Sequence, residues 1–324
     1  MTKPVVAVTD HVFPNLEPTR EALAGIGASL HLSKSPNADD ILAVARTADG
    51  VINCYAKLPG EVIEQFEQCR VIARTGIGVD TVDLDVASRK GIIVTNVPEY
   101  CEDEVSEHTM ALLLALARNV TRGNALVHSG VWDVGLVKPI YRLRGRTVGL
   151  VGFGKIPRLV ATKAQSFGMN VQTFDPYVDA DAAAAMNVES VPFDTLLETS
   201  DYVSVHAPLT PGTRNMINAD ALAKMRPGAL LINTARGPLV DIDALAAALD
   251  AGQIAGAALD VLPDEPPAAD LPLAGRDNVI LTPHTAFYSE QSMIDLQAKA
   301  AQQVALVLSG ADPTYPVNLD RLSD

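Results

Sequence analysis

The sequence is poor in cysteine and in basic residues, and each shortage argues against certain classes of protein. Only 3 of 324 residues are cysteine, namely Cys54, Cys69 and Cys101. They form no C-x-x-C pair and their number is odd, so we expect no disulfide framework. Lys and Arg number 25 against 39 Asp and Glu, which gives a net charge of −14. This balance argues against nucleic acid and against an anionic membrane surface as partners.

Long apolar runs and several enzyme motifs are also absent. The longest helical apolar run, Met110 to Ala117, is too short to span a bilayer. The chain starts with a strand-like segment, Val5 to Val8, and does not resemble a signal peptide. Neither H-E-x-x-H nor G-x-S-x-G occurs, and the six histidines are scattered, so we expect neither a metal site nor a serine nucleophile. The simplest location is the cytoplasm.

The pattern that is present alternates short apolar runs with helical ones along most of the chain. At 324 residues and 48% hydrophobic content, two medium-sized cores are the better expectation. Strands that alternate with helices imply parallel sheets covered by helices on both faces. The sequence therefore predicts an α/β fold with two doubly wound parallel sheets.

One stretch combines a strand, a glycine turn and a helix. Thr147 to Val151 is apolar, and Gly152-Phe153-Gly154-Lys155-Ile156-Pro157 then leads into a helical pattern from Leu159 to Phe167. Such a turn lets backbone N–H groups and the helix N-terminus face a pyrophosphate, although an ordinary strand-to-helix turn is the alternative. Pro157 replaces the last glycine of G-x-G-x-x-G. Proline fits a first helical turn, but it leaves open how closely the helix and strand approach.

An acidic residue stands at the end of the next predicted strand. Asn170 to Phe174 is that strand, and Asp175 follows it, 23 residues past Gly152. A carboxylate there can accept both hydroxyl hydrogens of an adenosine ribose and would repel a 2′-phosphate. The sequence therefore favours NAD over NADP as the cofactor.

Chemically versatile residues follow four other predicted strands. They are Thr234-Ala235-Arg236, Asp260 with Glu265, Pro283-His284, and His206. Each could be structural alone, but ligands of open parallel sheets lie beyond the carboxyl ends of the strands. A guanidinium suits a carboxylate and a carbonyl, and a histidine beside a carboxylate suits proton transfer. Arg236, His284 and Glu265 thus favour hydride transfer at a carbon that bears oxygen.

Two glycines also follow the predicted strand Val71 to Arg74. The loop Arg74-Thr75-Gly76-Ile77-Gly78-Val79-Asp80 could bring backbone N–H groups close to a small anion. A turn that merely needs positive φ is the alternative.

Several of these segments together resemble the D-isomer-specific 2-hydroxy-acid dehydrogenase family over nearly the whole chain. The segments are Thr147 to Asp175, Asn233 to Asp241, Ala257 to Val261 with Glu265-Pro266, and Thr282-Pro283-His284. Within the family, Asn96 to Tyr100 and Pro283 to Glu290 resemble the branch of the C-terminal-binding-protein corepressors. Phe287 stands where those corepressors carry tryptophan.

The resemblance implies a role for each matching residue. Arg236 would bind substrate, His284 would be the acid and base, and Glu265 its partner. The implied substrate-binding residues are Arg74, Ile77, Gly78, Tyr100 and Phe287. The implied NAD-binding residues are Gly152, Gly154, Lys155, Ile156, Asp175, His206, Thr234, Ala235, Arg236, Asp260, His284 and Ala286.

The resemblance also implies a domain plan. A Rossmann NAD-binding domain, residues 101–289, would be inserted into a flavodoxin-like substrate domain made of residues 1–100 and 290–324. The NAD-binding domain would form the contact of a homodimer.

Three functions stay open on the sequence. The favoured one is an NAD-linked reductase of a small 2-oxo acid such as glyoxylate or hydroxypyruvate. An NADH-sensing, corepressor-like binding protein is the second. A phosphoglycerate-dehydrogenase-like enzyme is the third: Arg74 matches one phosphate-binding arginine of such enzymes, but Asn53 and Val134 stand at the equivalents of two others. Formate dehydrogenases of the superfamily carry glutamine where this chain has Glu265, so hydroxy-acid chemistry is preferred.

Overall fold

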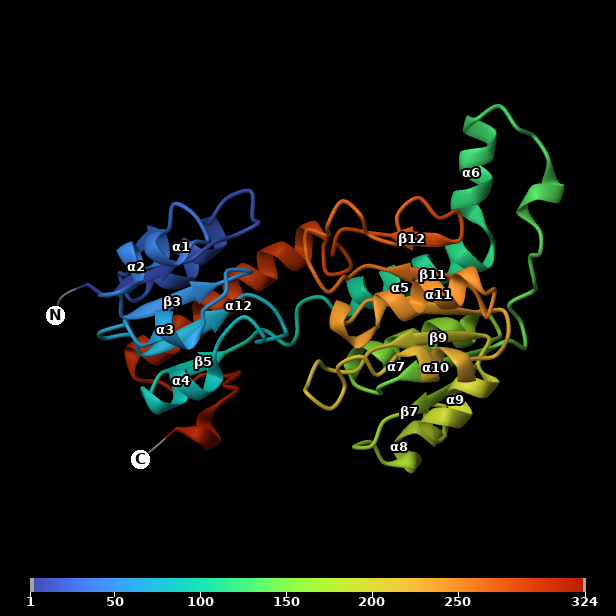
Figure 1. Ribbon diagram of the computed structural model, residues 1–324. Coiled ribbons are helices and arrows are strands. Elements are labelled where there is room, and N and C mark those ends of the chain that lie inside the picture. Colours follow the sequence, from blue (N-terminus) through green and yellow to red (C-terminus); the bar gives the residue numbers. More distant parts are fainter. Residues whose placement is uncertain (1–2, 323–324) are drawn as a thin grey trace. The chain divides into compact units, whose positions relative to one another are not determined.

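The computed structural model describes residues 3–322 and divides the chain into two compact units (Figure 1). Unit 1 comprises Met1–Tyr100 and Ser289–Asp324, and unit 2 comprises Cys101–Tyr288. The domain boundaries expected from the sequence differ from these at Ser289 alone. Ser289 belongs with the helix that follows it, because its side chain accepts from the N–H of Ser292 in a capping box.

Unit 1 contains a five-stranded, fully parallel sheet in the order β2-β1-β3-β4-β5. The strands are β1 (Val5–Val8), β2 (Ser29–Leu32), β3 (Gly50–Asn53), β4 (Val71–Arg74) and β5 (Ile93–Thr95). This is the flavodoxin-like order that was expected. The order reverses between β1 and β3, and in open sheets of this kind ligands bind past the carboxyl ends of the strands at such a reversal.

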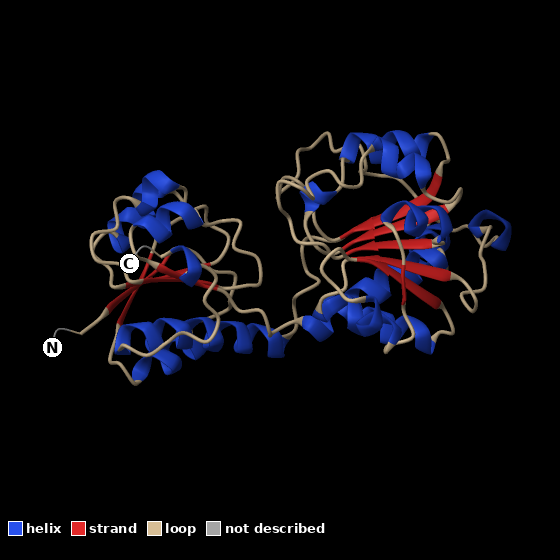
Figure 2. Ribbon diagram, turned by 90° about the horizontal axis from the view of Figure 1, so that it is seen from below, coloured by secondary structure: helices blue, strands red, loops and turns tan. Residues whose placement is uncertain are grey.

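Helices cover both faces of this sheet, as Figure 2 shows. They are α1 (Glu17–Ala24), α2 (Ala38–Ala45), α3 (Gly60–Ile63), α4 (Leu84–Arg89) and α12 (Glu290–Ser309), with a 3-10 turn η3 (Leu319–Arg321). Alternate residues of β1 divide between the faces. Val6 and Val8 pack with Leu23 of α1 and Val304 of α12, whereas Ala7 packs with the residues of α2, α3 and α4.

The C-terminal segment packs against the sheet of unit 1. The N–H of Val317 donates to the carbonyl of Val94, 2.9 Å away. Asn318 is fully buried; its Oδ1 accepts from the N–H of Val94, and its Nδ2 donates to Ser88 Oγ and to the carbonyl of Ile92. One amide side chain thus ties the chain end to both α4 and β5.

Replacing Asn318 by alanine is expected to destabilise the protein by about 2–4 kcal/mol, because buried donors and acceptors lose their partners. Urea unfolding of the variant measures this change. Asp320→Ala, at an exposed neighbouring position, serves as the control and should change the free energy of unfolding little. A loss for Asn318→Ala no larger than that of the control would contradict the prediction.

Unit 2 contains a seven-stranded parallel sheet in the order β12-β11-β10-β9-β6-β7-β8. The strands are β6 (Thr147–Val151), β7 (Asn170–Phe174), β8 (Glu189–Ser190), β9 (Tyr202–Val205), β10 (Ala229–Asn233), β11 (Ile254–Leu259) and β12 (Val279–Leu281). Counted along unit 2 alone and read from the β8 edge, the order is that of the Rossmann fold with one strand added. The switch point lies between β6 and β9.

Two layers of helices enclose this sheet (Figure 2). The helices of unit 2 are α5 (Glu102–Ala117), α6 (Val120–His128), α7 (Lys155–Ser166), α8 (Ala180–Ala184), α9 (Phe193–Thr199), α10 (Ala219–Lys224) and α11 (Ile242–Asp250), with 3-10 turns η1 (Val134–Val137) and η2 (Gly237–Leu239). Helices α5 and α7 pack on one face around Leu113, Leu150 and Val160. Helices α9, α10 and α11 pack on the other face around Leu196, Leu222 and Leu245.

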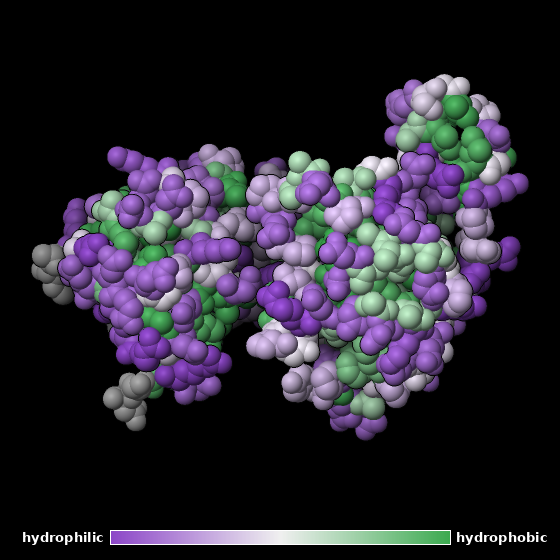
Figure 3. Space-filling model, viewed as in Figure 1, coloured by the Kyte–Doolittle hydropathy of each residue, from purple (hydrophilic) through white to green (hydrophobic). Residues whose placement is uncertain are grey.

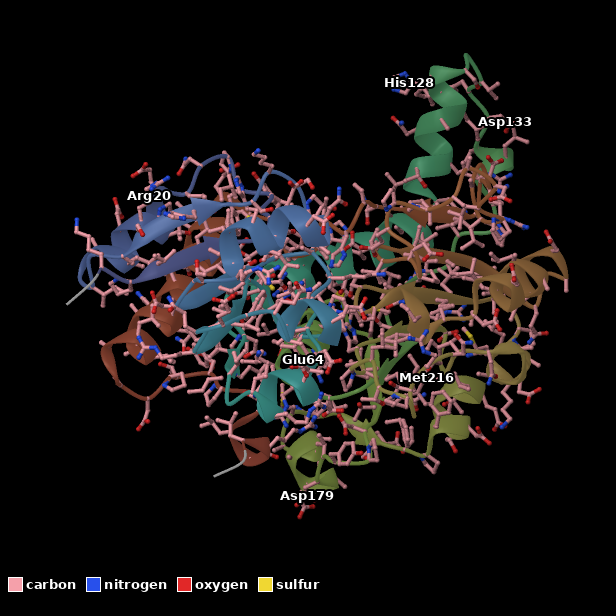
Figure 4. All side chains as sticks on the ribbon, turned by 60° about the vertical axis from the view of Figure 1, so that its left-hand side comes forward. Arg20, Glu64, His128, Asp133, Asp179 and Met216 are labelled. Atoms are coloured by element: carbon pink, nitrogen blue, oxygen red, sulfur yellow. The ribbon has the colours of Figure 1, made fainter. Side chains whose placement is uncertain are left out.

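A projecting segment, which we call the arm, comprises residues 120–137 with α6 and η1. Asn119 has a left-handed φ of 51° and separates α6 from α5. No residue of α6 is buried. Figure 4 shows His128 and Asp133 at the outer end of the arm, and Figure 3 shows apolar residues exposed on it. Helix α6 was not predicted from the sequence.

Two further observations concern the described part of the chain. No helix within residues 3–322 is long and apolar enough to cross a membrane. The same residues hold no group of three or more His, Cys, Asp or Glu side chains arranged to bind a metal ion.

Candidate active site

The predicted catalytic and cofactor-binding residues of unit 2 lie in loops that follow its strands. Asp175 follows β7, His206 follows β9, Arg236 lies past β10, Glu265 past β11 and His284 past β12. Because all seven strands are parallel, these loops share one edge of the sheet. The fold therefore places at one edge residues that are up to 109 positions apart in the chain, from Asp175 to His284.

His284 and Glu265 form a direct pair. The distance from His284 Nδ1 to Glu265 Oε2 is 2.6 Å, and 25% and 35% of the two side chains remain exposed. The other carboxylate oxygen, Oε1, accepts from the N–H of Leu262 at 2.9 Å. The Phe287 ring, predicted to lie near the substrate, packs edge-on against the His284 ring with centroids 5.8 Å apart. The imidazole is thus held from two sides.

Glu265 is ionised at neutral pH. Partial burial alone would raise the pKa of its carboxyl, but the hydrogen bond and charge of His284 and the N–H of Leu262 outweigh it. The net pKa of Glu265 lies below its ordinary value. An ionised carboxylate can only accept, so we assign the hydrogen of this bond to Nδ1 of His284. Nε2 is then the ring atom that can exchange a proton with a ligand.

The buried carboxylate of Asp260 shapes the loop that carries His284. Asp260 is 1% exposed, and it accepts from the hydroxyl of Thr282 at 2.5 Å and from the N–H groups of Thr285 and Ala286 at 2.9 Å each. Its carbonyl accepts from the N–H of His284 at 2.8 Å. Within this frame His284 has a left-handed φ of 52°, which is uncommon for a residue other than glycine.

Burial by itself would raise the pKa of Asp260. Hydrogen bonds from His108, Thr282 and the N–H groups of Ala286 and Thr285 outweigh the burial, so the pKa of Asp260 is lowered. The sequence predicted Asp260 as a cofactor-binding residue. The structure shows that its carboxylate also holds the 282–286 loop, and the cofactor contact stays a prediction.

The loop that carries Arg236 lies against the loop that leads to Glu265. A Cβ atom on Gly237 would come within 1.9 Å of the carbonyl carbon of Leu262, so only glycine permits this approach. The Asn233 side chain fixes the turn, because it accepts from the N–H of Ala235 and donates to the carbonyl of Arg236. The sequence analysis named Arg236 but not the steric role of Gly237.

The glycine turn is built as the sequence predicted. Gly152 has a φ of 101°, and a Cβ there would lie 3.1 Å from the backbone of His206 and Ala207, so the loops after β6 and β9 meet at the switch point. The N–H of Phe153 donates to Asp175 Oδ2 at 2.8 Å. The carboxylate predicted to bind ribose therefore also fixes the turn.

Helix α7 starts at Lys155, four residues before the apolar pattern at Leu159 indicated. Lys155 and Ile156, both predicted NAD-binding residues, form its first turn behind Gly154. Pro157 is buried in that turn and does not interrupt the helix, since the N–H that proline lacks would have no helical acceptor there.

His206 is uncharged at neutral pH. Burial lowers the pKa of its ring from 6.5 to about 3, although part of the residue remains accessible. Its Nε2 is hydrogen-bonded to the Ser204 hydroxyl at 2.8 Å. A neutral imidazole beside the glycine turn adds no positive charge to the predicted pyrophosphate site.

His206 should make folding pH-dependent. Between its ordinary and lowered pKa values the unfolded chain binds a proton that the folded chain does not, so stability falls as the pH falls from about 6.5 towards about 3. We expect His206→Gln to reduce this loss, measured by urea unfolding at about pH 7 and about pH 5. His128→Gln, at an exposed position on the arm, is the control. An unchanged pH dependence in His206→Gln would disprove the assignment.

Unit 1 carries the second predicted cluster, the loop after β4. Arg74 is 9% exposed, its Nε has no hydrogen-bond partner among residues 3–322, and its guanidinium carbon lies 5.9 Å from the centre of the Tyr55 ring. Gly76 has a φ of 149°, and a Cβ there would lie 1.2 Å from an Arg74 nitrogen. The backbone conformation therefore requires glycine, and a side chain here would also displace the Arg74 guanidinium from its position.

The same loop offers backbone donors. Within the described chain, the N–H groups of Ile77 and Gly78 have no hydrogen-bond acceptor, while the Ile77 carbonyl accepts from Asn96 Nδ2 at 2.7 Å. A buried guanidinium with an unpaired Nε is costly, and here it stands beside two available N–H donors. This combination fits the anion-binding loop expected from the sequence, and the anion contact itself stays a prediction. Tyr100, the other predicted substrate residue of unit 1, is half-buried at the last position before unit 2.

The structure also locates the two positions compared with phosphate-binding arginines. Asn53 is fully buried, donates to Thr9 Oγ1 and the Ala56 carbonyl, and accepts from the Thr81 hydroxyl. Its side chain is committed to the fold. Val134 is 73% exposed on the arm.

A Rossmann sheet with a glycine turn at its switch point and an acidic residue after its second strand defines a dinucleotide-binding protein. Comparison with known proteins specifies the class. Residues 110–286 match the model of the D-isomer specific 2-hydroxyacid dehydrogenase, NAD binding domain. The chain belongs to the D-isomer-specific 2-hydroxyacid dehydrogenase family, and unit 2 contains its NAD-binding domain.

Sequence relatives and solved structures agree with this assignment. The chain is 37% identical over 319 residues to D-3-phosphoglycerate dehydrogenase of Methanocaldococcus jannaschii, covering 98% of this chain and 60% of that protein. It is 35% identical to the corresponding enzyme of Mycobacterium leprae, with coverages of 99% and 60%. The chain thus spans about three fifths of the length of these relatives.

Among solved structures, a protein from Thermus thermophilus superposes with a TM-score of 0.87 at 34% identity, covering 97% of this chain and 99% of that one. D-lactate dehydrogenase of Aquifex aeolicus, in complex with NAD and lactic acid, superposes with a TM-score of 0.84 at 30% identity, with coverages of 94% and 96%. The resemblance of Asn96–Tyr100 and Pro283–Glu290 to the corepressor branch stays a prediction.

Proposed function

We propose that this protein is an NAD-dependent dehydrogenase that acts on C2 of a small D-2-hydroxy acid or, in reverse, of a 2-oxo acid. The observation that carries the proposal is the pairing of His284 with an ionised Glu265 at the sheet edge that also holds the glycine turn. When bound, NAD supplies the acceptor for the hydride.

The residues around the glycine turn fit the cofactor. Gly152 and Gly154 leave the backbone open, and the N-terminus of α7, at Lys155 and Ile156, faces the turn with its N–H groups. The Asp175 carboxylate suits an unphosphorylated adenosine ribose. The other proposed NAD contacts are His206, Thr234, Ala235, Arg236, Asp260, His284 and Ala286.

Proton transfer falls to the His284–Glu265 pair. Nε2 of His284 takes the proton of the substrate hydroxyl during oxidation and returns it during reduction. Glu265 fixes the tautomer and stabilises the imidazolium that forms, and the Asp260-anchored loop fixes the position of the ring. Arg236 would hold the substrate carboxylate and polarise the C2 oxygen with its planar fork.

The anion-binding loop of unit 1 supports an acidic substrate. Arg74 and the N–H groups of Ile77 and Gly78 would bind the carboxylate, with Tyr100 and Phe287 as further substrate-binding residues. An unphosphorylated substrate is favoured because Asn53 and Val134, at the positions compared with phosphate-binding arginines, have uncharged side chains and supply no cation for a phosphate.

D-3-phosphoglycerate is the second candidate substrate. Two observations favour it: the unpaired Nε of buried Arg74, and the similarity of the chain to the D-3-phosphoglycerate dehydrogenases of M. jannaschii and M. leprae. A single arginine is a weaker phosphate site than a cluster of arginines, so we place this candidate second.

Turnover with a panel of acids tests the proposal. We expect NADH oxidation with glyoxylate or hydroxypyruvate to exceed that with 3-phosphohydroxypyruvate, and His284→Ala to lower kcat by about 10²- to 10⁴-fold. Preference for the phosphorylated acid, lost in Arg74→Met, would establish the second candidate instead.

The corepressor-like alternative predicts NADH binding without turnover. Arg236→Gln separates the two readings, because a dehydrogenase loses far more turnover in this variant than NADH affinity, the latter measured by fluorescence titration. A wild-type protein that binds NADH yet oxidises none with any acid of the panel would refute the dehydrogenase proposal.

We also propose that the arm binds a second copy of this chain. Apolar side chains remain exposed along and beside it, namely Val120, Val127, Trp132, Val134, Leu136 and Tyr141. Trp132 is the most exposed of these residues, at 89%. Exposing such residues together is unfavourable in water, and the homodimer implied by the family resemblance would cover them. A cytoplasmic location likewise stays a prediction.

Trp132→Ser is expected to shift the protein from dimer towards monomer in sedimentation velocity, because large aromatic side chains dominate interface energies. Tyr177→Ser is the matched control, since Tyr177 is 94% exposed on unit 2 but lies outside the arm. Equal dimer fractions for both variants and the wild type would show that the arm is not the interface.

A further inference from the structure

Two consecutive residues of α5, His108 and Thr109, contact two different loops of the site. His108 reaches the loops after β11 and β12, and Thr109 reaches the loop after β10. Neither contact was foreseen from the sequence, where both residues lie within the amphipathic pattern of a long helix. Both contacts lie entirely within unit 2.

His108 supports the Asp260 carboxylate. Its Nε2 lies 3.1 Å from Thr282 Oγ1 and 3.4 Å from Asp260 Oδ1. The Thr282 hydroxyl donates its only hydrogen to Asp260 Oδ1, so it must accept from His108. Nε2 of His108 therefore carries a hydrogen, which faces both oxygen atoms.

The hydrogen bonds continue from Asp260 to the catalytic loop. The same carboxylate accepts from the N–H groups of Thr285 and Ala286, which flank His284 on its C-terminal side. Without His108, Thr282 would lose a donor and the nearly dry carboxylate would lose part of its compensation. The left-handed backbone at His284 would then be less firmly held.

Thr109 anchors the loop after β10, which carries Arg236. Its hydroxyl donates to the Val105 carbonyl at 2.7 Å within α5 and must therefore accept from Thr234 Oγ1, which lies 2.8 Å away. Thr109 is fully buried and Thr234 is 7% exposed. Thr234 precedes Ala235 and Arg236, so this bond anchors the turn that presents the guanidinium.

We propose that His108 and Thr109 are positioning residues of the dehydrogenase reaction, holding the His284 loop and the Arg236 loop on one rigid helix. The inference rests on the proposed function. Neither side chain touches the substrate; each acts through the loop that it anchors. Displacement of a reacting group by about 1 Å can reduce turnover by about 10²-fold, so modest loosening of either loop is enough to matter.

Steady-state kinetics on matched variants tests the proposal. We expect His108→Leu and Thr109→Val to lower kcat by about tenfold or more, by a larger factor than any rise in the KM for NADH, with the melting temperature changed little. His108→Gln keeps an N–H donor and Thr109→Ser keeps the hydroxyl, so both should recover most of the loss. Glu107→Gln, at an exposed position of the same helix, is the control and should leave kcat unchanged.

The outcomes separate the two proposals. No turnover in the wild type refutes the proposed function. Normal turnover in the wild type with kcat unchanged in His108→Leu and Thr109→Val overturns the positioning role. A fall in melting temperature without a fall in kcat would also overturn the positioning role. So would a loss of kcat that His108→Gln and Thr109→Ser do not recover. Should His108→Leu fail to fold, Thr109→Val, which conserves volume, decides the question at the second loop.

Discussion

The site of unit 2 depends on one buried interaction, the carboxylate of Asp260 with the groups that donate to it. A carboxylate that is almost inaccessible to water is costly unless hydrogen bonds replace its hydration. Asp260 receives them from Thr282, Thr285 and Ala286, all in the loop that carries His284. The hydrogen bonds that satisfy the carboxylate are therefore also the ones that shape the loop. They maintain the uncommon backbone conformation of His284.

The parallel topology explains why residues so distant in the chain can act together. Each strand of unit 2 delivers its following loop to the same edge, and the strand order reverses between β6 and β9, where open sheets of this kind bind their ligands. Two glycines then set how closely the loops approach. Gly152 lets the turn after β6 meet the His206 loop, and Gly237 lets the Arg236 loop lie on the backbone of Leu262.

The sequence predicted the elements and residues that carry a local signal. Apolar periodicity located most of the helices and every strand except β8. Helices α4, α6 and α8 were missed, because they are short or lack a buried stripe. His108 and Thr109 carried no functional signal, since their partners Thr282 and Thr234 are 174 and 125 residues away. Asn53 was compared with a ligand position, and only the structure shows that its amide belongs to the core network.

The two units differ in how their polar groups are satisfied, and the difference has a physical meaning. Asp260 in unit 2 has donors from its own chain, so its loop is organised before any ligand arrives. Arg74 in unit 1 is buried with an unpaired Nε, beside N–H groups of Ile77 and Gly78 that have no acceptor within residues 3–322. A loop with unpaired N–H donors has a higher free energy than one whose donors all have acceptors. An anion that supplies these acceptors would lower the free energy of the loop. Under the proposed function, an anionic substrate would gain part of its binding free energy from polar groups that the fold leaves unsatisfied, whereas the fold itself holds the His284–Glu265 pair in place.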